Sequence, residues 1–196
     1  MLSLFIALAT TAAQAATAPQ QSNATSATTG HRLKDVPNVT LSYYDVQGKD
    51  GKAIEKNLKA VRTDKTTKQF SAVSSNWNVA ATVTKSTTDG KCTIKAVKPQ
   101  FSATVTLPRL ANEAAVKPEV LTQWRSYVAG LETSIADNFF FVYEQLPALQ
   151  NSVTGLECSA GAAAWDSGIG RIKTAAIQRG EATAAAAKAA AVPAKQ

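Results

Sequence analysis

The hydrophobic pattern of this 196-residue chain changes its period near Pro118, and this change most constrains the fold. Before Pro118, apolar and polar residues alternate, as in Trp77, Val79 and Ala81, which is typical of half-buried strands. After it, apolar residues recur every three or four positions and fall on one stripe of a long helix. The members of this stripe are Val120, Leu121, Trp124, Val128, Leu131, Ile135, Phe139, Val142 and Leu146. Strands first and helices after predict an α+β fold, in which an antiparallel sheet from the N-terminal half is packed by long C-terminal helices.

The first part of the predicted domain combines one strand with one short helix. Residues 39–47 are rich in β-branched and aromatic side chains, which favour a strand. Residues 53–61 carry Ile54, Leu58 and Val61 at helical spacing, with lysines on the other side. This spacing predicts a short amphipathic helix.

A β-hairpin is predicted in the middle of the chain. Residues 70–85 alternate as a strand does, and Asp89-Gly90 follows, which is the strongest short signal for a hairpin turn. Residues 92–99 and 101–107 are again strand-like, and Pro99 between them predicts a bend or a sheet edge.

Two helices are predicted in the C-terminal half. The long helix begins near Pro118, and we expect it to end at Pro147, because proline disrupts a helix interior. A second helical stretch covers about residues 148–179, with an interruption expected near Gly155 or Gly168.

The two ends of the chain predict an exported protein with one domain. Residues 1–15 form a short apolar run that ends in Ala13-Gln14-Ala15, a pattern that signal peptidase accepts. The run is too short to span a membrane, and no positive charge precedes it. A short N-terminal core helix is the alternative interpretation of this run. Residues 16–37 read as a disordered leader, 38–180 as one α+β domain and 181–196 as an Ala-rich tail.

Export predicts a periplasmic or secreted location, and this location bears on the oxidation state of the two cysteines. In an oxidising compartment, an even cysteine count suggests a disulfide, and Cys92 with Cys158 is the one intramolecular pair available. Two buried free thiols are the alternative. No transmembrane span is expected.

The chain is basic, with a formal net charge of +7, but its lysines are scattered. They form no dense run and no motif interleaved with aromatic residues, so we expect a solvated basic surface and no nucleic-acid partner. Salt-sensitive binding to an anionic polymer or lipid in the cell envelope is an alternative role for these lysines.

A series of short landmarks gives the chain a family resemblance. The landmarks are Tyr43-Tyr44-Asp45-Val46-Gln47-Gly48, Ser75-Asn76-Trp77-Asn78-Val79, Gly90-Lys91-Cys92-Thr93-Ile94, Thr106-Leu107-Pro108-Arg109, then Trp124, Tyr127 and Cys158. In this order they resemble the bacterial family of secreted proteins described as zinc-dependent proteases and catalogued as domain of unknown function 922. The resemblance covers roughly residues 39–172. It implies a metalloprotease-like domain with zinc as its cofactor.

The resemblance places the family's chemistry on the long helix, in a His-Glu-x-x-His motif. Two His four residues apart share one Zn²⁺, and the Glu acts as general base on the metal-bound water. The corresponding positions in this chain read Leu131-Glu132-Thr133-Ser134-Ile135. Glu132 keeps its register as a relic of the general base, but Leu131 and Ile135 have no lone pair to offer a metal. The chain's single histidine, His31, lies in the leader.

These substitutions predict a protease-like protein that is catalytically inactive and has no cofactor. Such a pseudoenzyme would bind or scaffold an unknown protein or peptide partner in the cell envelope. One alternative is a hydrolase or peptidase that uses Glu132 as base without zinc. The other is a basic protein that binds the cell envelope through its lysines. No catalytic or metal-binding residue is predicted beyond the relic Glu132.

A run of aromatic residues on the long helix allows two interpretations. Phe139, Phe140 and Phe141 span about 200° of a helix surface, so they do not all face one core. Either the helix is central and buried on both sides, or one or two of these residues, with Tyr143, are exposed for a partner.

Overall fold

The computed structural model describes residues 31–190, with side chains up to residue 183. The predicted signal, residues 1–15, and the end of the predicted tail, residues 191–196, lie outside the described residues. The elements, in chain order, are η1 (Leu33–Asp35), β1 (Val39–Val46), α1 (Gly51–Arg62), β2 (Ser74–Thr88), β3 (Lys91–Leu110), η2 (Glu113–Ala115), α2 (Pro118–Val153) and α3 (Cys158–Ala190). The α+β class and the order of strands before helices are confirmed.

The sheet is mixed, with strand order β1-β3-β2. β2 and β3 pair antiparallel as predicted, but β1 pairs parallel to β3, with Val39 opposite Ala103 and Val46 opposite Leu110. The alternation of apolar and polar residues within one strand does not indicate whether that strand pairs parallel or antiparallel. The expectation of a purely antiparallel sheet is therefore corrected at β1.

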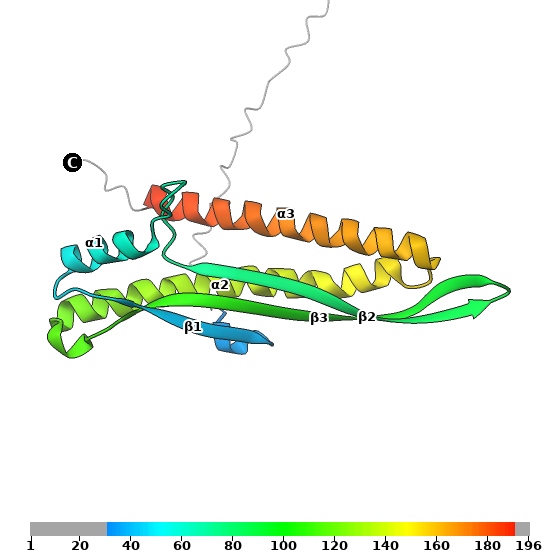
Figure 1. Ribbon diagram of the computed structural model, residues 1–196, viewed down its shortest axis with the longest axis horizontal. Helices are drawn as coiled ribbons and strands as arrows, with labels where there is room; N and C mark the ends of the chain where they lie inside the picture. The colour runs from blue at the N-terminus through cyan, green and yellow to red at the C-terminus, as the bar shows by residue number, and fades with distance from the viewer. Residues whose placement is uncertain (1–30, 191–196) are drawn as a thin grey trace, which may run out of the picture.

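The β2–β3 hairpin is long and extends past the helices (Figure 1). Its turn contains Asp89 at φ 51° and Gly90 at φ 76°, as the predicted two-residue turn requires. The two strands predicted on either side of Gln100 are one continuous strand, β3. Pro99 fits into it because β1 pairs with β3 only from Ala103 onward, so the edge opposite β2 has no strand partner at Pro99.

α2 is longer than predicted, because it continues through Pro147 to Val153. The prediction that Pro147 ends the helix is wrong. Leu146, Leu149 and Val153 are all buried, and packing of this last part outweighs the loss of one backbone hydrogen bond at proline. The predicted break near Gly155 is confirmed, since Gly155 has φ 87° and lies between the two helices. Gly168 lies inside α3.

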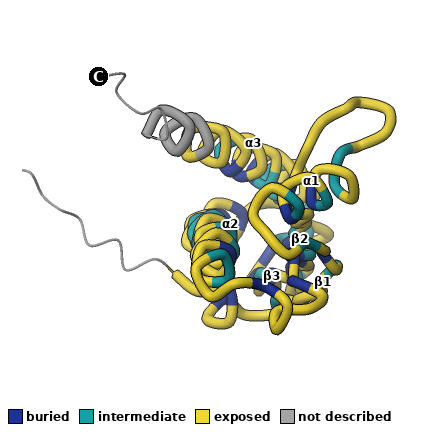
Figure 2. The backbone as a smooth tube through the Cα atoms, turned by 90° about the vertical axis from the view of Figure 1, so that its left-hand side faces the viewer, coloured by how far each residue is buried: buried dark blue, intermediate teal, exposed yellow. Residues whose placement is uncertain are grey.

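The main core lies between the sheet and the two long helices, which turn their buried sides toward each other and the strands (Figure 2). Phe101 and Leu107 of β3 meet Phe139 and Val142 of α2, and Ile172 of α3 joins them. A second cluster, which we call the α1 cluster, contains Val46, Ile54, Leu58, Ala72, Leu110, Val116 and Trp124. The two clusters position α2 as the central element of the domain.

The folded part of the chain begins before residue 38, the boundary expected for the leader. Leu33 and Val36 are buried in the main core, at 2% and 5% exposure. Their burial orders the short helix η1, so the interpretation of residues 31–37 as disordered is corrected. Among the described residues, no helix is both long and apolar enough to cross a membrane.

Candidate functional site

Residues 131–135, where the resemblance implies a zinc motif, lie in the middle of α2, and the two expected ligand positions pack against the core. Leu131 and Ile135 are half-buried and both contact the main core. Leu131 also packs against the α1 cluster. The two side chains therefore contribute to the hydrophobic core.

Glu132 lies between these positions and is half-buried. Within the described part of the chain it forms neither a hydrogen bond nor an ion pair with a side chain. A general base must lie within hydrogen-bond reach of the proton that it abstracts.

The chain's only histidine lies against a different part of α2. The Nδ1 atom of His31 is 2.9 Å from Oδ1 of Asp137, and its ring stacks on Phe140 with centroids 3.9 Å apart. The backbone N–H of His31 also donates to Asp137. Phe140 follows Leu131 by nine residues, which places it half a turn around the helix. His31 thus lies on the opposite side of α2 from Leu131.

The donor set on α2 does not fit the zinc that the resemblance implies. Zn²⁺ in proteins is held by Cys, His and carboxylate groups that converge on one point. No cluster of three such residues occurs among residues 31–183, whose side chains the structure describes. We therefore assign no metal-dependent step to the residues of α2.

A different feature of α2, an apolar cleft, is the best candidate for a binding site. It lies between α1 and the first turns of α2 and has a volume of about 350 Å³. Its apolar lining consists of Ile54, Leu58, Phe70, Val120, Trp124 and Tyr127, and we call it the aromatic cleft. Phe70 and Tyr127 both line this hollow and are 44% and 40% exposed.

Each wall of the aromatic cleft is held by local structure. Asp50 caps the start of α1, where its side chain accepts from the Ala53 N–H at 2.9 Å, and Ile54 and Leu58 form the buried face of this helix. Phe70 lies in the loop after α1, where it forms a β-bridge with Thr63. Trp124 is buried, and the Tyr127 ring lies 5.8 Å from it.

Tyr44 supports the cleft from β1. Its hydroxyl donates to the Ala72 carbonyl at 2.7 Å, and the Arg62 guanidinium lies 5.0 Å from the ring centroid. Burial raises the pKa of Tyr44 to about 12, although the nearby Arg62 acts in the opposite direction. Burial also raises the pKa of Tyr127. Both phenols are therefore neutral at physiological pH.

The sequence of residues 41–190 matches the family described as "Bacterial protein of unknown function (DUF922)", which is more than half of the chain. The chain belongs to this family. No curated protein and no solved structure is significantly similar to it. The family match confirms the resemblance drawn from the landmarks at the level of the family.

Two of the landmarks that indicated the DUF922 family, Trp124 and Tyr127, meet in the aromatic cleft. Leu131 lies one helical turn beyond Tyr127, so the expected ligand position continues the same side of α2. Glu132 and Ile135 do not line the cleft. Sequence reasoning missed Phe70 as a lining residue, because it was placed inside a strand and only tertiary packing brings that loop to α2.

The aromatic run on α2 is divided between several neighbours. Phe139 is buried in the main core, Phe140 lies under His31, and the Arg179 guanidinium is 5.5 Å from the Phe141 ring. Only Tyr143 is exposed, at 45%. The interpretation of α2 as a central helix, packed on both sides, is favoured for the three phenylalanines.

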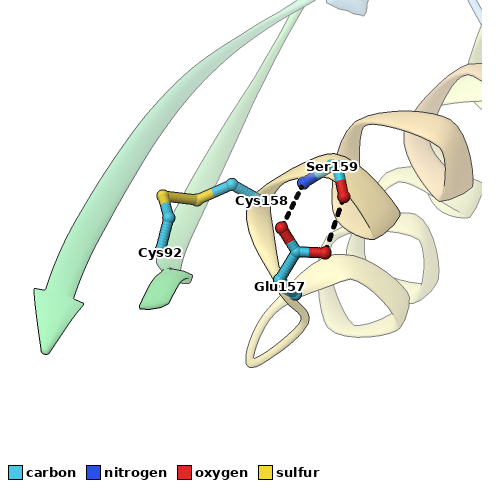
Figure 3. The surroundings of a disulfide bond; sticks show 4 residues. All are labelled: Cys92, Glu157, Cys158 and Ser159. Carbon is cyan, nitrogen blue, oxygen red and sulfur yellow. Dashed lines mark hydrogen bonds between the residues drawn. A yellow bond between two sulfur atoms is a disulfide. The ribbon is translucent and has the colours of Figure 1, made fainter. Parts of the chain in front are cut away.

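The disulfide joins the hairpin to the turn between the long helices. Cys92 on β3 is bonded to Cys158, the first residue of α3, with Cα atoms 5.5 Å apart (Figure 3). Beside it, Glu157 accepts from the Ser159 N–H and hydroxyl, and these bonds lower the pKa of Glu157. The predicted pairing of the cysteines is confirmed.

Proposed function

We propose that this chain is an exported, protease-like protein that has no zinc-dependent activity and binds a peptide or protein segment in the aromatic cleft. The observation that carries the proposal is the packing of Leu131 and Ile135 against the core, at the positions where the resemblance implies zinc ligands. A helix that uses these positions for the core keeps the scaffold of the domain without the metal.

Export is supported by two independent features of the chain. Residues 1–15 have the length and the Ala13-Gln14-Ala15 ending of a cleavable signal. The Cys92–Cys158 disulfide is typical of proteins that work in an oxidising compartment. Both fit a role in the periplasm or outside the cell.

The partner is a peptide or protein segment with an apolar anchor residue. The cleft is mostly apolar, and Gln123, Glu55 and Lys59 supply polar groups at its margin. Exposed aromatic residues around a hydrophobic hollow are the usual anchors of binding energy in protein interfaces. The exposed side chains of Phe70 and Tyr127 would enclose one large apolar side chain.

Peptide selection followed by point variants tests this proposal. Nine-residue peptides selected from a random library on the mature protein would be measured by fluorescence anisotropy. We expect Phe70→Ala and Tyr127→Ala each to weaken binding at least about tenfold, because each removes a wall of the cleft. Tyr143→Ala is the matched control, since Tyr143 is an equally exposed aromatic residue of α2 outside the cleft. Equal affinity in all three variants would contradict a binding role for the cleft.

A further inference from the structure

The outer part of the hairpin, residues 82–98, is a basic arm. It contains Lys85, Lys91, Lys95 and Lys98 and a single acidic residue, Asp89. All four lysines are exposed, and none takes part in an ion pair within the part of the chain that the structure describes. Four positive charges and one negative charge are thus concentrated on one projecting element (Figure 1).

The arm is held against the turn between α2 and α3 by contacts close to its tip. Two-stranded hairpins are marginally stable alone in water. Here the disulfide fixes Cys92 to α3, and the turn between α2 and α3 adds backbone bonds to Ile94, from Ile94 N–H to Leu156 at 2.9 Å and from Gly155 N–H to Ile94 at 2.8 Å. These contacts present the arm in one orientation without covering its outer face.

The lysines lie on both faces of the arm. Val97 is buried against the helices, so its neighbour Lys98 points to the opposite face. Lys91 likewise points away from α3, because Cys92 points toward it. Lys85 instead lines a hollow with Trp165 and Asp166 of α3. The register shift between Thr84 and Lys85 leaves Lys95 without a partner on β2.

We infer that the arm binds a flexible, linear polyanion that carries phosphate groups. Lys91, Lys95 and Lys98 follow one another along about 23 Å of β3, at roughly 3.3 Å per residue. Lys91 and Lys98 of this row point away from the helices, whereas Lys85 points toward α3, so a flexible chain of anionic groups can follow the row and also reach Lys85. A flat bilayer contacts one face only, and the tip, Thr87-Thr88-Asp89-Gly90, has no apolar side chain to enter lipid. Lysine ammonium groups bind phosphate as point charges, without the paired geometry that arginine provides for carboxylates.

Binding of long-chain inorganic polyphosphate by the full mature chain tests this inference. We expect binding at low salt that weakens as salt is added, because exposed charges are screened. The variant Lys95→Glu with Lys98→Glu should weaken it at least about tenfold, and the neutral pair Lys95→Gln with Lys98→Gln should weaken it less. Circular dichroism and thermal unfolding of each variant confirm that the fold is intact.

The matched control is Lys52→Glu with Lys56→Glu on α1, which changes the net charge equally at the far end of the molecule. We expect this control to change polyphosphate binding less than about twofold. Equal losses in both charge-reversal variants would show a general charge effect and overturn the inference. Absence of salt-sensitive binding would overturn it too. So would binding to phosphatidylglycerol vesicles that depends on the arm while polyphosphate binding does not.

Discussion

At the scale of single residues, the side chain at position 131 decides whether this part of α2 can bind a metal or packs in the core. A histidine at this position would present a lone pair to a metal, whereas leucine adds apolar surface to both core clusters. The same helical period serves either purpose, because residues four apart share one face. Residue identity at two positions therefore decides between a metal site and a core.

Truncation of Leu131 should lower stability, and truncation of its neighbour Ser134 should not. Leu131→Ala removes apolar contacts from a half-buried side chain, so we expect the free energy of unfolding to fall by about 1–3 kcal/mol. Ser134 is exposed in the same motif, and Ser134→Ala should change that free energy by less than about 0.5 kcal/mol. Urea unfolding of both variants measures the difference. Equal stability of the two variants would mean that Leu131 is not a core residue.

Tyr44 should make stability fall at high pH. Its pKa is about 12 in the folded protein and near its ordinary value of 10 when unfolded, so the unfolded chain loses the proton first as the pH rises. The contribution is complete below pH 10 and is lost as the pH rises toward 12. Tyr44→Phe should flatten this dependence and, by removing the bond to Ala72, cost about 1 kcal/mol at pH 7.

Unfolding by urea at several pH values between 7 and 11 checks this expectation. Tyr43→Phe is the control at pH 7, since Tyr43 is the neighbouring tyrosine of β1 and is 48% exposed. A wild-type protein and a Tyr44→Phe variant with the same pH dependence would refute the role given to Tyr44.

At the scale of elements, α3 approaches α2 closely at one glycine. A Cβ added to Gly168 would overlap the Cδ1 atom of Leu149, which is buried, whereas a Cβ on Gly170 would meet open space. Gly168 is therefore the contact point that allows the two long helices to pack, and the sequence alone suggested a helix break there. A glycine inside a helix has a packing role that its low helix propensity conceals.

Alanine substitutions at these two glycines should have opposite effects. Gly168→Ala should lower the free energy of unfolding by about 1–3 kcal/mol, because α3 or Leu149 must shift. Gly170→Ala should raise it by about 0.5–1 kcal/mol, because alanine favours the helix and finds free space. Thermal unfolding gives the sign of each change. A stabilised Gly168→Ala variant would contradict the close packing of α2 and α3.

The elements also show which parts of the fold can be predicted from patterns in the sequence. The Asp89-Gly90 turn, the alternation of β2 and the stripe of α2 are local signals, and each gave the correct element. The predicted end of α2 at Pro147 was wrong, because the buried residues beyond it continue the helix through their tertiary packing. The sequence patterns did not predict the parallel pairing of β1 for a related reason, since pairing direction depends on the path of the whole chain.

At the scale of the whole molecule, the domain combines one long central helix, α2, with two separate surfaces. α2 supplies the core, the aromatic cleft lies at its N-terminal end, and the basic arm projects at the other end of the molecule (Figure 1). The sequence predicted the loss of zinc ligands and named Trp124 and Tyr127 as landmarks. It did not predict that these two residues line a cleft, because Ile54, Leu58 and Phe70 come from distant segments.

The measurement that tests the central claim most directly is the zinc content of the purified mature protein, washed with a chelator and then exposed to excess zinc and dialysed. Leu131 and Ile135 pack in the core and offer no ligand atoms, so we expect well below about 0.1 zinc per chain by elemental analysis. A matched variant, Leu131→Ala, should give the same result. About one zinc per chain that is retained through dialysis would contradict the core role of these two positions.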